Sequence, residues 1–429
     1  MKKKYRIILY TSIFLLCVVA SIILVVKKSN SVYEEESKPK VVKHKSMLSM
    51  NLEQTAGSGD YKTVTQSSWP TEGYKFNAEL SKCENGSTLS WDDTKKAVIV
   101  SGNLSDKCYV YFDIYQPTLA EYIKSQYTGT QGENNIYYHD SDLANGAGDN
   151  SYRYAGANPN NFVCFGTTES PCPTDNLYRI IGVFGENYHG VTGKQLVKLI
   201  KYDYMTTDEL GTDGDYSQTY KEWGMDSTYK GTYGDGERIG VYYWNYKATG
   251  SATNTWSTSL LNKTNLNTNF INNIGTTWAN KIATVTWKVG GNTWANIGTK
   301  TSSVAYTNEI TNPVTTNTTD NATTYSAKIG LMYVSDYGFA ASPDAWTLTM
   351  SSYNNTTATN NNWMYMGLYE WTISRNAVSS NSAFSVNNGG YVNNYAVDGY
   401  YGVRASFNLE SSVSYVSGSG SMSDPIVIN

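Results

Sequence analysis

The alternation of apolar and polar residues predicts a β-rich chain, and it is clearest near the carboxyl end. Residues 402–409 alternate strictly, which predicts a strand with one buried face. Residues 383–386 and 391–392 flank the sequence Asn-Asn-Gly-Gly, which is typical of a hairpin turn. An apolar run at 328–334 predicts a buried strand, and 178–184 with 196–202 predicts a second hairpin.

Helical spacing is less common along the chain. Residues 117–126 predict a short amphipathic helix with Pro117 near its first turn. Apolar residues from Trp256 to Ile274 recur at helical spacing after Asn254 or Thr255, either of which suits an N-cap, and the helix should pack on the sheet. Residues 301–324 are rich in Thr and Asn, so we expect a long surface insertion there.

A predominantly apolar run occupies residues 7–26, and its length suits one crossing of a bilayer. Basic residues precede this run, which predicts an amino terminus that stays inside and an exported remainder. No small-residue cleavage site follows it, so an uncleaved signal-anchor is favoured over a removable signal peptide. The expected location is therefore the cell membrane, single-pass, with the C-terminal part extracellular.

The chain has five cysteines, of which Cys17 falls within the predicted span. The other four allow three pairings. We expect two disulfides, Cys83–Cys108 and Cys164–Cys172, because each pair falls within one local segment. The spacing typical of zinc ligands is absent, so no metal site is predicted.

These patterns divide the chain of 429 residues into five segments. The segments are an anchor at 1–28, a stalk at 29–60, a small β module at 61–115, a helical linker and loop at 116–151, and a main domain at 152–429. A bridge between Cys83 and Cys108 suits a module too small for a full core. The formal net charge of −4 argues against a nucleic-acid partner.

Between residues 376 and 401 the apolar skeleton is thin, consisting of Val378, Phe384, Val386, Val392 and Val397. If that skeleton faces the core, polar and aromatic residues crowd the exposed face or its loops. Tyrosine gives rigid contact area and asparagine gives adaptable hydrogen bonds, which is typical of a binding surface. A solvated loop with Asn and Gly turns is the alternative interpretation. The candidate ligand-binding residues are Asn387, Asn388, Tyr391, Asn393, Asn394, Tyr395, Asp398, Tyr400 and Tyr401.

The run Glu370-Trp371-Thr372, the hairpins and the closing Gly402-Val403-Arg404 resemble the C-terminal half of C-type-lectin-like domains. The pattern is similar to domains of uncharacterised bacterial surface proteins, over roughly residues 177–428. The wider group includes formylglycine-generating enzymes and the variable proteins of diversity-generating retroelements. The resemblance implies an α+β, C-type-lectin-like main domain, in which Glu370, Trp371 and Arg404 are structural and the two charges form a buried pair.

The two branches of this group imply different functions. The enzymes use a copper-binding cysteine pair in the C-terminal half, whereas no cysteine follows Cys172 in this chain, so no cofactor is expected. In the retroelement branch, adenine-directed mutagenesis of Asn codons yields Asn, Tyr, Ser, Asp, Gly and Ala. These residue types fill residues 376–401, and the resemblance therefore implies a variable binding surface.

Two further candidate sites, one for calcium and one for glycoside hydrolysis, have weaker support in the sequence. A calcium loop built from Asp140, Asp142, Asn145 and Asp149 lacks the EF-hand spacing and its distal glutamate, so a structural turn is expected. Asp336 and Glu370 as a glycosidase acid and base lack a supporting motif, so turn and ion-pair roles are expected.

The sequence therefore predicts a membrane-anchored ligand-binding or adhesion protein that is not an enzyme. Its expected partner is an extracellular protein or glycan, besides the membrane contacted by the N-terminal helix. Two alternatives stay open: a metal-dependent enzyme of the same fold, and a structural envelope protein without a ligand.

Overall fold

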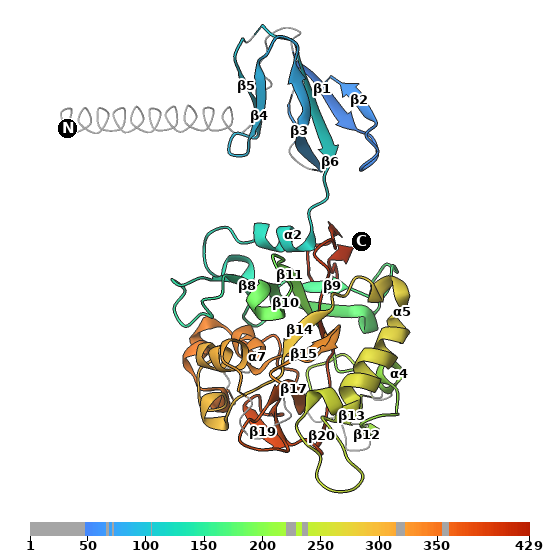
Figure 1. Ribbon diagram of the computed structural model, residues 1–429, viewed down its shortest axis with the longest axis vertical. Coiled ribbons are helices and arrows are strands. Elements are labelled where there is room, and N and C mark those ends of the chain that lie inside the picture. Colours follow the sequence, from blue (N-terminus) through green and yellow to red (C-terminus); the bar gives the residue numbers. More distant parts are fainter. Residues whose placement is uncertain are drawn as a thin grey trace, which may run out of the picture. The chain divides into compact units, whose positions relative to one another are not determined.

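The computed structural model describes residues 48–65, 68–70, 73–103, 105–219, 229–233, 239–314, 322–353 and 360–429. The chain divides into two compact units, one ending at Gln116 and the other beginning at Pro117 (Figure 1). Strands outweigh helices, and the helices are short. The predicted α+β class is therefore met only loosely, because the architecture is mainly β.

The structure does not support the predicted transmembrane helix. A helical span needs about 20 mostly apolar residues. Within the described ranges no helix combines the length and the hydrophobicity needed to cross a membrane. Among the described residues, the helical segment 261–279 is rich in Asn and Thr and is interrupted at Gly275, whose φ is 75°. The predicted anchor at 1–28 lies outside the described residues, and neither the signal-anchor nor the single-pass membrane location is retained.

The smaller unit contains a four-stranded sheet in the order β2-β1-β6-β3, together with the hairpin β4-β5. Strands β1 and β6 are parallel, and the other neighbours are antiparallel. Its hydrophobic core is small, and the buried cluster consists of Met50, Leu52, Trp69, Val98, Val110 and Phe112. The strands are β1 (Leu48–Glu53), β2 (Tyr61–Val64), β3 (Tyr74–Cys83), β4 (Thr88–Asp92), β5 (Ala97–Ser101) and β6 (Cys108–Ile114).

The predicted stalk at 29–60 is too long at its C-terminal end. Its last residues form β1, whose Met50 and Leu52 are buried in the core of the smaller unit. Leu48, Met50 and Leu52 alternate with polar residues, so the strand pattern is present in the sequence. The small β module therefore begins at least as early as Leu48 rather than at residue 61.

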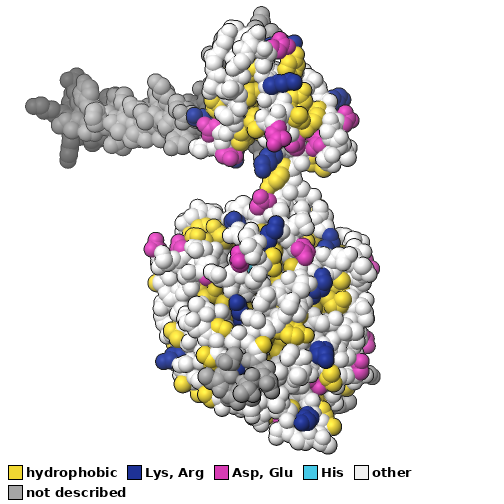
Figure 2. Space-filling model, in the orientation of Figure 1, with side chains coloured by type: hydrophobic (Ala, Val, Ile, Leu, Met, Phe, Trp, Pro, Cys, Tyr) yellow, Lys and Arg dark blue, Asp and Glu magenta, His cyan; other side chains and the backbone are white. Residues whose placement is uncertain are grey.

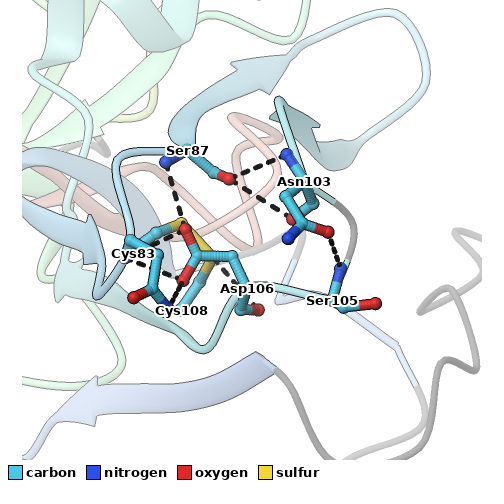
Figure 3. Close-up of a disulfide and its surroundings, with 7 residues drawn as sticks. Cys83, Ser87, Asn103, Ser105, Asp106 and Cys108 are labelled. Carbon is cyan, nitrogen blue, oxygen red and sulfur yellow. Dashed lines mark hydrogen bonds between the residues drawn. A yellow bond between two sulfur atoms is a disulfide. The ribbon is translucent and has the colours of Figure 1, made fainter.

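A disulfide and a buried aspartate connect the segment before the β4-β5 hairpin with the segment after it (Figure 3). The disulfide between Cys83 and Cys108 links β3 to β6, as predicted from the sequence. Next to it, the carboxylate of Asp106 accepts hydrogen bonds from the backbone N–H groups of Asn85 and Ser87, at 2.9 and 3.1 Å. Two cross-links, one covalent and one polar, therefore hold the ends of this segment together.

The larger unit is built on a seven-stranded sheet, ordered β16-β21-β11-β10-β8-β7, with β9 also paired to β10. Its central hairpin, β10 with β11, confirms the hairpin predicted at 178–184 and 196–202. Every residue of both strands is buried, because elements cover both faces of the sheet. The strands are β7 (Ile136–His139), β8 (Ser151–Tyr154), β9 (Phe162–Cys164), β10 (Leu177–Phe184), β11 (Leu196–Lys201), β16 (Ile329–Gly330) and β21 (Ser406–Asn408).

Smaller sheets complete the larger unit: β12-β13-β20, β14-β15, β17-β18-β19 and β22-β23. Figure 1 places β19 and β20 at one end of this unit and α2 at the other. The strands are β12 (Tyr216–Thr219), β13 (Gly240–Tyr243), β14 (Val285–Lys288), β15 (Thr324–Ala327), β17 (Glu370–Arg375), β18 (Ser382–Val386), β19 (Val392–Ala396), β20 (Tyr400–Tyr401), β22 (Tyr415–Ser417) and β23 (Val427–Ile428).

The helices of the larger unit are short. The α-helices are α2 (Leu119–Ser125), α3 (Glu186–His189), α4 (Thr207–Leu210), α5 (Ile271–Ala279), α6 (Ser302–Tyr306) and α7 (Val334–Ala340). The π-helical stretches are η5 (Leu261–Phe270) and η7 (Thr307–Thr311). The 3-10 turns are η1 (Glu133–Asn135), η2 (Thr174–Asn176), η4 (Trp256–Thr258), η6 (Trp294–Asn296), η8 (Pro343–Thr347) and η9 (Met350–Ser352).

The segment predicted as a linker, residues 116–151, belongs to the larger unit. Its helix α2 begins after Thr118, which forms a capping box with Glu121. Its strand β7 is the edge of the seven-stranded sheet. The second predicted disulfide, Cys164–Cys172, is also present in this unit. The main domain therefore starts near Pro117 rather than at residue 152.

Three sequence-based predictions fail for a shared reason. Residues 402–409 are buried on both faces, because β21 is an inner strand, between β11 and β16, of a sheet that is covered on both sides. Only Ile329–Gly330 of the predicted strand at 328–334 is a strand, and the chain then enters α7. Residues 302–311 are helical, with Tyr306 and Ile310 buried, rather than part of a surface insertion. In each case, contacts with residues distant in sequence override the local pattern.

Candidate functional site

The hairpin β18-β19 carries the candidate face, and its turn is fixed by hydrogen bonds. Asn387 accepts the Gly390 N–H through its backbone carbonyl at 2.8 Å and donates its own N–H to the carbonyl of Tyr391 at 2.8 Å. Its side-chain oxygen accepts the Gly389 N–H, also at 2.8 Å. Tyr365 adds a bond from its hydroxyl to the carbonyl of Asn388. The turn is thus a fixed support for the residues of β19.

Four aromatic rings pack together next to this turn. Tyr401 stacks on Tyr369 with ring centroids 5.1 Å apart, and Tyr395 meets both rings edge-on at 5.5 and 5.9 Å. The fully buried Trp371 lies beneath, with its ring centroid 4.5 Å from that of Tyr401. The three tyrosines are half-buried. Part of each ring system therefore remains accessible on a rigid base.

Asparagine amides surround the Tyr395 hydroxyl. The side chains of Asn387 and Asn393 each donate to it at 3.3 Å. The Asn393 side-chain oxygen accepts the N–H of Asn394 at 2.8 Å. The Tyr395 hydroxyl is also hydrogen-bonded to the side chains of Tyr369 and Tyr391, so asparagine and tyrosine side chains form one polar network around it.

A second group of tyrosines borders the first through β-pairing. Strand β13 pairs with β20, so Tyr242 lies opposite Tyr401, and Tyr243 opposite Tyr400. Tyr243 stacks on Tyr246 at 4.6 Å, and the side chain of Tyr246 is 46% exposed. We define the tyrosine face as Tyr243, Tyr246, Tyr369, Tyr391, Tyr395, Tyr400 and Tyr401.

The nine candidate residues differ in exposure. Asn387 is buried and serves the turn, whereas Asp398 is exposed. The others, Asn388, Tyr391, Asn393, Asn394, Tyr395, Tyr400 and Tyr401, are half-buried. Four members of the predicted apolar skeleton, Phe384, Val386, Val392 and Val397, are buried, but Val378 is 64% exposed and does not belong to it.

A buried ion pair involves Glu370, the first residue of β17 and the neighbour of Tyr369. Arg404 contacts Glu370 in a bidentate manner, Nε to Oε1 at 2.8 Å and Nη2 to Oε2 at 2.9 Å. Both side chains are buried, and Arg404 also donates to the carbonyl of Met364 at 2.6 Å. The indole N–H of Trp371 donates to the carbonyl of Tyr242 at 2.9 Å. The three residues expected to be structural thus connect the sheets that bear the face.

Within residues 387–401, which supply four tyrosines of the face, Asp398 is the one acidic or basic residue. Burial raises the pKa of Tyr369 and of Tyr391, and the neighbouring Tyr395 raises both further. Each phenol therefore keeps its proton and can donate it. On the side of the larger unit drawn in Figure 2, charged side chains lie singly among uncharged ones.

The other candidate sites have structural partners. Asp140 accepts the N–H groups of Asp142 and Leu143, and Asp149 pairs with Arg153 at 2.7 Å. Asp336 and Glu370 are both buried and belong to two different ion pairs. Over the residues that the structure describes, no group of three or more His, Cys, Asp or Glu side chains is placed to hold a metal ion.

Three residues of the face were missed by the sequence reasoning. Tyr369 precedes the inward-facing Glu370, so strand alternation would have placed it outward. Tyr243 and Tyr246 lie about 150 residues before β20 in the chain, a separation at which local pattern gives no pairing signal. Only the tertiary structure brings them beside Tyr400.

The comparisons with known proteins give no relative for this chain. No family model matches it, and neither a curated protein nor a solved structure is significantly similar to it. The C-type-lectin-like resemblance therefore rests on the sequence motifs and stays a prediction.

Proposed function

We propose that this protein is a non-enzymatic binding protein that recognises a protein or glycan ligand through the tyrosine face. The observation that carries the proposal is the set of half-exposed phenol rings fixed over Trp371. Their mutual packing limits ring motion before binding, so little conformational entropy is lost when a ligand covers them.

The chemistry of the face supports an uncharged, polar ligand surface. Phenol hydroxyls and asparagine amides supply both donors and acceptors, while the rings supply apolar contact area. Ring faces pack against the C–H groups of sugars or against aliphatic and aromatic side chains. The part of the face formed by residues 387–401 offers little charge complementarity to an acidic or basic ligand, because Asp398 is the one acidic or basic residue in that range.

Replacing Tyr391, Tyr395 and Tyr400 together with alanine is expected to reduce affinity at least about tenfold, because buried aromatic side chains dominate interface energies. The purified full-length chain would first be screened on glycan and protein arrays. A ligand found there would then be titrated against wild type and variant by calorimetry.

The matched control is the triple alanine variant of Tyr127, Tyr138 and Tyr152. These rings are also half-buried and in mutual contact, at 4.6 to 5.9 Å, but they lie near β7 and β8. The control variant should keep full affinity. Equal affinity of both variants and wild type for the ligand, or failure of the folded wild type to bind any array component, would reject the proposal.

A further inference from the structure

A buried lysine and a buried aspartate lie in direct contact inside the larger unit. The Nζ atom of Lys198 is 2.7 Å from Oδ2 of Asp336, and both side chains are fully buried. Lys198 belongs to β11 and Asp336 to α7, so 138 residues separate them in the chain. A charged pair without access to water is costly, because desolvation opposes the charged form of each partner.

The surroundings of the lysine are aromatic. Its Nζ lies over the rings of Tyr333, Tyr188 and Trp287, at 4.4, 4.8 and 5.0 Å from the ring centroids. Burial lowers the pKa of this amine, whereas the adjacent Asp336 opposes that shift. Transfer of one proton to the carboxylate would give a neutral amine, which is the nucleophilic form.

A tyrosine hydroxyl bridges the two groups. The Nζ of Lys198 donates to the Tyr188 oxygen at 2.6 Å, and the Tyr188 hydroxyl donates to Oδ1 of Asp336 at 2.6 Å. The hydroxyl thus connects the amine with the carboxyl oxygen that does not contact it directly. A group in this position can relay a proton between them.

Further donors polarise the same carboxyl group. The backbone N–H of Tyr333 donates to Oδ2 at 2.9 Å, and the Arg153 guanidinium lies 3.7 Å from Oδ1. Donors held in a dry site stabilise negative charge that develops on carboxyl oxygens during nucleophilic attack. The fixed approach of amine to carboxyl also removes most of the entropy cost of bringing two reactants together.

We propose that Lys198 and Asp336 form an intramolecular isopeptide bond, an amide between the lysine side chain and the aspartate side chain. The Nζ–Cγ bond forms and the Cγ–Oδ1 bond breaks. Two protons leave the ammonium nitrogen through the Tyr188 hydroxyl and reach Oδ1, which departs as water. The ammonium and the carboxylate become one neutral amide plus one water, with no change of oxidation state and no added reagent.

Formation of this bond would remove two buried charges and would join β11 to α7 covalently. Arg153 would keep a partner, since it pairs with Asp149 at 2.7 Å. The cross-link would hold a long loop closed in the unfolded chain as well, which limits its conformational entropy.

Peptide mapping by mass spectrometry tests the proposal on the folded full-length chain after disulfide reduction. Trypsin cannot cleave after an acylated Lys198, so a linked peptide containing both residues is expected. Its mass should lie about 18 Da, one water, below the sum of its two parts. Recovery of the folded wild type with a free Lys198 and an unmodified Asp336 would overturn the proposal.

Three variants test the roles of Lys198 and Tyr188 in forming the bond. Lys198→Met should abolish the linked peptide, and Tyr188→Phe should slow its accumulation after refolding by removing the relay. The matched control is Lys201→Met, which removes another buried lysine of β11, paired with Glu209 at 3.1 Å, and should leave the linked peptide intact. A linked peptide that persists in Lys198→Met would exclude this lysine as the nucleophile.

Discussion

Replacing Arg404 with methionine is expected to lower the free energy of unfolding of the larger unit by about 3–5 kcal/mol, because the buried Glu370 would lose its charge partner. The side chains of this pair are 1% and 2% exposed, so water cannot substitute for the guanidinium. Denaturant unfolding followed by tryptophan fluorescence would measure the loss. The signal reports mainly on the larger unit, because Trp69 and Trp91 are the only tryptophans of the smaller one.

The stability loss of the Arg404→Met variant is expected to depend on pH, in a direction that follows from the pKa of Glu370. Burial raises that pKa, and Arg404 opposes the shift, so removal of Arg404 should raise it further. A carboxyl with a raised pKa in the native state binds a proton more tightly there than in the unfolded chain, which favours the native state as pH falls. The deficit against wild type should therefore be smaller at about pH 5 than at about pH 8.

Two controls separate charge burial from a loss of packing. The double variant Arg404→Met with Glu370→Gln should recover part of the loss, because no uncompensated charge remains. Replacement of the exposed Lys263 by methionine should leave stability unchanged. A loss below about 1 kcal/mol in Arg404→Met, the same at both pH values, would show that the pair contributes little.

Removing the Cys83–Cys108 bridge by a double serine substitution is expected to destabilise the smaller unit by about 3–4 kcal/mol, from the entropy of the released loop. The sequence separation of the two cysteines is 25 residues. Because the unit buries few apolar side chains, a loss of this size is a large fraction of its stability. Hydrogen exchange of peptides from β3 and β6 would measure the change within the intact chain.

The corresponding double serine variant of Cys164 and Cys172 serves as the control. That bridge spans 8 residues and lies in the larger unit, so β3 and β6 should exchange as in wild type. Unchanged protection of β3 and β6 in the Cys83 and Cys108 variant would contradict the prediction. In that case the Asp106 hydrogen bonds and the small core would suffice to hold the unit together.

The local pattern predicted well those elements whose partners are near in sequence. The hairpin β10-β11, the turn before β19 and the two disulfides each form within one continuous segment. Apolar residues such as Phe384 and Val392 are buried as the alternation requires. The helix predicted at 117–126 is present as α2, but it begins at Leu119 because Thr118 forms the N-cap.

What the sequence by itself determined is therefore the type and position of elements that depend on neighbouring residues. Tertiary structure alone decided that β21 is buried on both faces, that β13 lies beside β20, and that Lys198 meets Asp336. The physical reason is that alternation specifies which side chains share a face of a strand, but not which distant strand or helix covers that face. Contacts between segments separated by more than a hundred residues arise from packing of the whole unit.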